Sequence, residues 1–170
     1  TTVYCSRRYE PWAARQEKAV HDALAGRDIE LRRHGGSLLH EPGTVLTQSG
    51  DPYKVFTPFW RACRAESIAR PRPVADIEWA GRVPSDQLDS WGLTPRAPDW
   101  AADWHEIWTP GEAGASERLN AFLEKAVDDY GRRRDLPAEA GTSRLSPHLH
   151  HGELSPRQVW ALCEQRKSAT

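Results

Sequence analysis

The sequence predicts a mixed fold in three parts: the tail of a parallel α/β domain at residues 1–35, a long connector at 36–108, and the start of an all-helical domain at 109–170. Three observations carry this prediction. A strand–helix–strand pattern opens the chain, most of the thirteen prolines lie in the middle, and the strongest helical periodicity follows residue 108. Because neither outer part is long enough to close a core, we expect an internal piece of a longer protein.

The first 35 residues alternate between strand and helix signals. Val3 and Tyr4 end a short strand, and apolar residues recur at helical spacing from Glu10 to Ala25. Ile29–Leu31 then alternates like a strand, and a glycine pair at 35–36 breaks it. This order is typical of a parallel sheet.

The connector has only short periodic stretches between its prolines and glycines. Thr57 and Pro58 predict the start of one helix, whose inner face carries Phe59, Ala62 and Cys63. Long irregular segments in compact proteins usually have a function of their own, and joining two domains is the simplest.

The helical part begins with a predicted capping box at Thr109–Glu112, with proline at the first helical position. An amphipathic helix is expected to follow from apolar residues at helical spacing: Leu119, Phe122, Leu123, Ala126, Val127 and Tyr130. A further helix is predicted at Pro156–Gln165, with Val159, Trp160 and Cys163 facing inward.

The run from Gly141 to Gln158 carries two Ser-Pro pairs, each of which predicts an N-cap followed by the first helical residue. Ser155 and Gln158 also complete a capping box. Hydroxyl groups and a guanidinium precede the first cap, so side-chain and backbone donors can converge on a phosphate-bearing ligand. The alternative is a loop whose hydroxyls satisfy only their own backbone.

Five strings, in order, resemble the DNA photolyase and cryptochrome family and together cover nearly the whole chain. They are RRYEPW (7–12), GGSLLHEP (35–42), YKVFTPFWRA (53–62), W-x-PGEAGA (108–115), and the segment from Tyr130 through RDLP to GTSRLSPHLHHGELSPRQVW (141–160). The resemblance implies the C-terminal part of a Rossmann-like α/β domain at 1–35, an interdomain connector at 36–108 and the start of an all-α FAD-binding domain at 109–170. The strings resemble an internal part of a bacterial cyclobutane pyrimidine dimer photolyase.

The same resemblance implies roles for individual residues. The segment Thr142, Ser143, Arg144, Leu145 and Ser146 wraps the diphosphate and ribityl part of FAD. Tyr130 contacts the flavin nucleotide, although periodicity alone favours a core aromatic. Arg134 lies beside the DNA phosphates at the lesion, whereas Arg132 and Arg133 read as a solvated helix end, and Asp135 as a residue that orients a neighbour.

The family's activity implies light-driven DNA repair, in which excited reduced FAD splits a pyrimidine dimer in ultraviolet-damaged DNA. The catalytic residues and the electron-transfer tryptophans are expected beyond Thr170, so packing roles are expected for Trp60, Trp91, Trp100, Trp104 and Trp108. Some relatives carry a second, antenna chromophore; here Trp12 and Ala13 replace the Asn-Glu pair that holds a folate antenna, and the identity of any antenna stays open. A cryptochrome without repair activity and an inactive remnant are the alternatives.

Composition and charge also constrain how the protein could bind DNA, metals or membranes. The formal net charge of −1 means that DNA must be attracted by a local patch, and the densest is Arg132–Arg134. Three widely spaced cysteines predict free thiols, and the histidines at 148, 150 and 151 lack a carboxylate or thiol at metal-binding spacing, so no metal is expected. With no apolar span, we expect a cytoplasmic, monomeric parent protein without a membrane partner.

Overall fold

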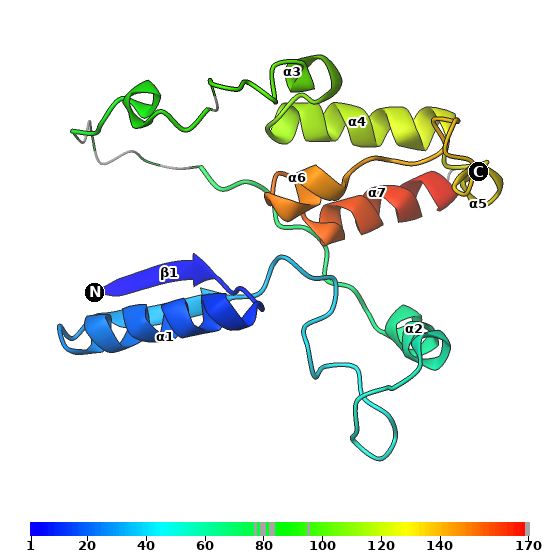
Figure 1. Cartoon of the computed structure of the whole chain (residues 1–170). Helices are drawn as coiled ribbons and strands as arrows, with labels where there is room; N and C mark the ends of the chain where they lie inside the picture. The colour runs from blue at the N-terminus through cyan, green and yellow to red at the C-terminus, as the bar shows by residue number, and fades with distance from the viewer. Residues whose placement is uncertain (77, 79–80, 82–83, 95, 169–170) are drawn as a thin grey trace.

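The computed structural model describes residues 1–76, 78, 81, 84–94 and 96–168. The remaining residues are 77, 79–80, 82–83 and 95 of the expected connector and 169–170 of the expected helical part, and they lie outside the described residues. Figure 1 shows the strand–helix unit, a long irregular middle segment and a group of helices as successive regions of the chain.

The α/β part consists of β1 (Thr2–Ser6), α1 (Pro11–Ala25) and β2 (Glu30–His34). The two strands pair in parallel, with Thr2 opposite Glu30 and Ser6 opposite His34, which confirms the predicted parallel arrangement. Helix α1 packs on β2 (Figure 1) but buries only Ala13 completely. Its apolar face is otherwise largely exposed, because a sheet of two strands covers little of a fifteen-residue helix.

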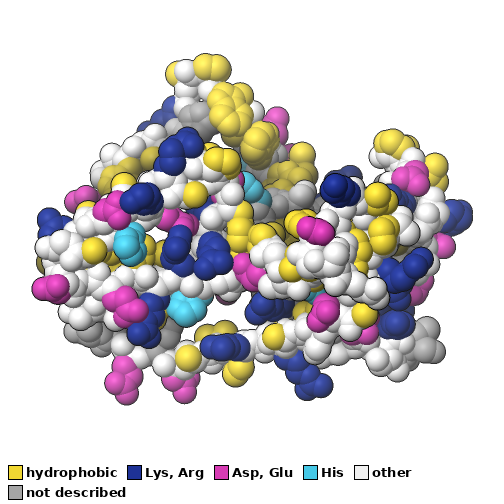
Figure 2. Space-filling model, turned by 90° about the horizontal axis from the view of Figure 1, so that it is seen from below, with side chains coloured by type: hydrophobic (Ala, Val, Ile, Leu, Met, Phe, Trp, Pro, Cys, Tyr) yellow, Lys and Arg dark blue, Asp and Glu magenta, His cyan; other side chains and the backbone are white. Residues whose placement is uncertain are grey.

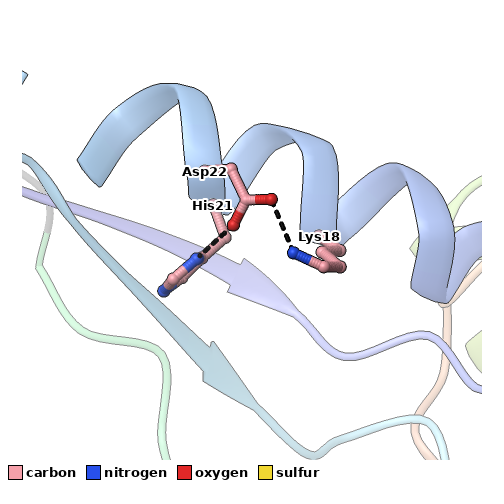
Figure 3. A network of polar contacts seen from close by, with 3 residues as sticks. All are labelled: Lys18, His21 and Asp22. Atoms are coloured by element: carbon pink, nitrogen blue, oxygen red, sulfur yellow. Dashed lines mark hydrogen bonds and ion pairs between the residues drawn. The ribbon is translucent and has the colours of Figure 1, made fainter. Parts of the chain in front are cut away.

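The outer face of α1 carries a small polar network (Figure 3). Asp22 accepts a hydrogen bond of 2.6 Å from Lys18, one turn earlier, and lies 3.2 Å from His21 Nδ1. The hydrogen bond from Lys18, followed by the one with His21, lowers the pKa of Asp22 below its usual value. All three side chains are exposed, so the network is a solvated helix surface worth little to stability.

The connector contains α2 (Phe56–Ala65), a 3-10 turn η1 (Leu88–Trp91) and the single-turn helix α3 (Trp104–Ile107). Helix α2 begins one residue before the predicted Thr57, and its inner face buries Cys63, as expected. Three of the connector tryptophans expected to pack are not buried, since Trp91, Trp100 and Trp104 are more than half exposed. Trp100 and Trp104 instead contact each other edge to face at 5.3 Å.

Four helices form the helical part: α4 (Glu112–Lys125), α5 (Tyr130–Arg133), α6 (Ser146–His150) and α7 (Pro156–Ser168). Helices α4 and α7 lie side by side, with the segment leading into α6 beside them (Figure 1). The core between them consists of buried apolar residues from α4, from the loop before α6 and from the loop before α7: Ala115, Leu119, Leu123, Leu145 and Leu154. Helix α7 packs against this core through partly buried residues, Val159, Leu162 and Cys163. This is the main hydrophobic core in the described part of the chain.

Two helix predictions in this part are wrong. The amphipathic helix does not reach Tyr130: α4 ends at Lys125, and the N–H groups of Ala126 and Val127 both donate to the Phe122 carbonyl, which closes the helix. The predicted capping box at 109–112 is absent as well. Gly111, with φ of 97°, is the residue before α4, and its N–H donates to Glu153 of a distant loop.

The two Ser-Pro pairs behave differently. Ser155 forms the predicted capping box, since its Oγ accepts the Gln158 N–H at 3.2 Å and its own N–H donates to the Gln158 side chain at 2.7 Å. Ser146 is not an N-cap: it is the first residue of α6, the flanking residue is Leu145, and the hydroxyl makes no capping bond. The same dipeptide therefore caps one helix and merely opens the other.

The chain as a whole exposes a large surface. Its accessible area is 14365 Å², whereas a compact protein of 19.2 kDa exposes about 8,400 Å². Several large apolar side chains of the connector contribute to this excess, among them Phe56, Leu88 and Leu93, each at least 66% exposed. The excess shows that the described elements leave much apolar surface uncovered.

Candidate functional site

The loop at 142–146 leads from α5 to α6 along the edge of the helical core. Leu145 is only 4% exposed and packs in that core, while Thr142 and Arg144 are exposed. The Leu145 side chain is therefore structural, and only its backbone can face a ligand. The hydroxyls and amides on either side of it remain at the surface.

The backbone of this loop has the form of an anion-binding nest. Arg144 adopts a left-handed conformation with φ of 51°, and Leu145 follows in the right-handed region at φ −87° and ψ −3°. Successive residues of opposite hand direct their N–H groups toward one side, where they can bind an anion. Within the described residues, the hydroxyls of Thr142, Ser143 and Ser146 have no protein hydrogen-bond partner, so they too are available to a ligand.

The start of the loop is held by Arg133. Gly141 is buried against the Arg133 backbone, where a Cβ at position 141 would lie 2.8 Å from the Arg133 carbonyl oxygen. The Arg133 guanidinium donates to Glu139 at 2.6 Å. Arg133 is therefore a packed, ion-paired residue, which corrects its assignment to a solvated helix end.

Tyr130 and Arg134 lie together at α5. The Tyr130 ring packs edge to face on Phe122 at 5.8 Å, and the Arg134 guanidinium lies 5.7 Å from the centre of the Tyr130 ring. Tyr130 is still 39% exposed, so it combines the packing role with an accessible hydroxyl. Asp135 lies 3.4 Å from the Arg134 guanidinium in an exposed ion pair.

The structure does not bring all predicted site residues to one place. Figure 1 places α5 at the C-terminal end of α4 and α6 near its N-terminal end. The three arginines of the densest basic patch also have acidic neighbours, namely Asp129, Glu139 and Asp135. Figure 2 shows basic and acidic side chains interspersed over the face that it draws, in keeping with a net charge near zero.

Sequence reasoning missed a partly buried cluster around Glu153, in which His148 is buried. One carboxylate oxygen accepts the Gly111 N–H at 2.9 Å, and the other accepts from His148 Nδ1 at 2.5 Å. The His148 bond, followed by the Gly111 bond, lowers the pKa of Glu153 against the opposing effect of desolvation. The Trp108 ring packs edge to face on His148 at 6.3 Å. No local signal indicates this cluster, because Gly111 and Glu153 are 42 positions apart.

A second missed contact joins two of the family-like strings. The Tyr9 hydroxyl donates a short hydrogen bond to Glu41, and burial together with this bond raises the pKa of Tyr9. The Glu41 carboxylate occupies the space that a Cβ at position 35 would need, so any larger residue there would displace the Glu41 side chain. The GG pair at 35–36 is a strand breaker in the sequence; in the structure Gly35 lies against the Glu41 side chain, whereas the space around Gly36 is open.

The surroundings of the cysteines and histidines bear on two expectations, free thiols and the absence of a metal site. Cys5, Cys63 and Cys163 are free, which confirms the cysteine prediction. His150 and His151 contact each other edge to face, and among the described residues no group of three potential metal ligands comes together. In the same part of the chain, no helix is both long enough and apolar enough to span a membrane.

Other cavities are bordered by described residues away from the loop at 142–146. One of about 1040 Å³ is bordered by residues 68–71, α4 and α7. Another of about 430 Å³ runs along α2, and one of about 500 Å³ is lined by Trp104, Trp108 and the His148–Glu153 pair. Trp12, the residue at the expected antenna region, is half exposed beneath the Arg8 guanidinium at 4.6 Å, and Ala13 is buried.

Comparison with known proteins agrees with the fold and with the motifs that surround these sites. A DNA photolyase family model matches residues 1–76. The deoxyribodipyrimidine photo-lyase of Agrobacterium fabrum is 44% identical over 94% of this chain and 34% of its own length, and that of Synechococcus sp. (strain ATCC 27144) is 34% identical over 93% and 34%. Residues 1–76 thus match the DNA photolyase family model, and nearly the whole chain is similar to deoxyribodipyrimidine photo-lyases.

Among solved structures, the chain is similar to a bacterial class III photolyase from Agrobacterium tumefaciens, with a TM-score of 0.77 and 40% identity over 94% of this chain and 34% of that one. A Synechocystis cryptochrome shares the fold at a TM-score of 0.71 and 21% identity, over 98% of this chain and 36% of that one. The chain spans about a third of the length of the photolyases that it matches.

Proposed function

We propose that this chain is part of a light-driven DNA repair enzyme, a deoxyribodipyrimidine photolyase that splits cyclobutane pyrimidine dimers with FAD as its cofactor. The observation that carries the proposal is the loop at 142–146, where a backbone nest and three unpartnered hydroxyls stand within the family-like string GTSRLS. The relative that is 44% identical over nearly the whole chain is a deoxyribodipyrimidine photo-lyase.

The loop fits the phosphate end of a flavin nucleotide. Amides at Arg144 and Leu145 would bind phosphate oxygens, and the hydroxyls of Thr142, Ser143 and Ser146 would donate to the diphosphate and ribityl groups. Tyr130 would contact the nucleotide through its exposed side. When bound in its reduced form, FAD supplies the excited-state electron that opens the dimer.

Arg134 is the residue we assign to DNA. Its side chain is 55% exposed, and its contact with Asp135, at 3.4 Å, is a solvated ion pair of little strength. A DNA phosphate can therefore replace or share that partner at small cost. The Arg134 guanidinium, which lies near the Tyr130 ring, would hold the DNA backbone beside the flavin site.

We further propose that this activity belongs to a longer protein. In it, residues 1–35 form the last part of an α/β domain, residues 36–108 link this domain to the next, and residues 109–170 begin the FAD-binding domain. Two observations support this: the chain covers only 34% of the Agrobacterium fabrum photo-lyase, and it exposes 14365 Å² of surface. The partner would be ultraviolet-damaged DNA. We place the protein in the cytoplasm as a monomer without metal; the identity of any antenna chromophore is left open.

A blue-light receptor of the cryptochrome type is the second candidate, because cryptochrome-2 of Arabidopsis thaliana is 29% identical over 98% of this chain and 28% of its own length. The test is the absorption spectrum of the purified parent protein, followed by loss of dimers from ultraviolet-irradiated DNA under blue light. Flavin bands with light-dependent repair support the photolyase. Flavin bands without repair support the receptor, and absence of flavin contradicts both.

A further inference from the structure

Glu153 joins two segments that are far apart in the sequence. Its side chain is 21% exposed and lies between the start of α4 and the helix α6. One oxygen accepts the Gly111 N–H, and the other accepts from His148, whose side chain is 3% exposed. Within the described residues His148 Nε2 has no hydrogen bond, so Glu153 is the one polar anchor of this ring.

Helix α6 depends on such external support. It has five residues, and one turn of helix cannot pay its own nucleation cost in water. The loop before it contains Arg144 in a left-handed conformation, which is unfavourable for any residue with a Cβ. Leu145 and Leu149 attach one side of α6 to the core, and His148 attaches another to Glu153.

We infer that His148 and Glu153 are positioning residues for the loop at 142–146: they hold α6 against the start of α4 and thereby hold the nest in the form that binds an anion. Neither residue belongs to the loop itself. That the anion is the flavin diphosphate rests on the proposed function, whereas the mechanical link between Glu153 and α6 does not.

The test uses His148→Gln and Glu153→Gln in the full chain, with His150→Gln as the matched control. His150 lies on the same helix but is exposed and has no contact with Glu153. Hydrogen exchange is followed at the Leu149 and His151 amides, which are bonded within α6, and at amides of α4 near Leu119, which report the core.

We expect exchange at the α6 amides to rise roughly tenfold in both test variants, with a smaller change at the core amides and none in the control. An equal rise at both places would mean general destabilisation and would overturn the inference, as would no rise. His148→Gln removes the His148–Glu153 bond but keeps the Gly111–Glu153 bond. It therefore provides the test if the Glu153→Gln variant does not fold.

A second measurement separates this inference from the proposed function. FAD is titrated into the parent protein and its variants, and the dissociation constant is expected to rise roughly tenfold for His148→Gln but not for His150→Gln. If FAD binds but its affinity is unchanged, the positioning role is wrong. If the unaltered protein binds no FAD, the proposed function fails, while hydrogen exchange still decides whether Glu153 holds α6.

Discussion

Leu119 is the residue whose truncation should cost the helical part most. It is 1% exposed, it lies in the middle of α4, and its neighbours in the core come from α4, from the loop before α6 and from the loop before α7. Replacement by alanine removes three carbon atoms at about 0.8 kcal/mol each and leaves a cavity that the neighbours fill only in part.

From these terms we expect Leu119→Ala to lower the free energy of unfolding by about 3 kcal/mol. The value lies in the lower half of the range for such substitutions because Leu119 also borders the cavity of about 1040 Å³, toward which neighbouring side chains can relax. A loss of this size is a large fraction of the total stability of a small domain.

Urea unfolding followed by circular dichroism measures the change. With a slope of about 2 kcal/mol per molar urea, the midpoint should fall by about 1.5 M. Leu88→Ala is the control, since Leu88 is 66% exposed in η1 and should cost less than about 0.5 kcal/mol. Equal midpoints for the two variants would refute the assignment of the core.

Four further results are expected. Ser155→Ala removes the capping box of α7 and should cost about 1 kcal/mol in urea unfolding, whereas Ser168→Ala at the far end of α7 should cost less. Arg134→Ala in the parent protein should weaken DNA binding and reduce its salt slope by about one while sparing flavin content; an unchanged slope would remove Arg134 from the interface. The pKa of Glu153 is lowered in the folded state. Its contribution to stability is therefore present above its unfolded-state pKa and is lost as pH falls through its folded-state pKa. In the Glu153→Gln variant, the decrease in unfolding free energy at acid pH should accordingly be smaller. The chain of 170 residues should bind FAD weakly, because one wall of a pocket buries little of a ligand; stoichiometric retention through gel filtration would contradict this.

Several features were predictable because their signals are local. The strand–helix–strand order at the start, helix α2 and the capping box of α7 each depend on residues within a few positions of one another. Hydrophobic periodicity and capping chemistry act over that range, so the sequence alone indicates them. The same holds for the donors of the loop at 142–146, whose residue types and order are visible in the sequence.

Other features depend on tertiary contacts. The end of α4 at Lys125 and the loss of the capping box at 109–112 could not be predicted, because apolar periodicity continues past the break and Gly111 donates to a carboxylate 42 residues away. The left-handed Arg144 is held by packing at Leu145. Local sequence thus determined which elements form and which donors the loop offers, while long-range packing and the Glu153 bonds decided where the helices end and how the loop is presented, because such contacts arise only when distant segments meet.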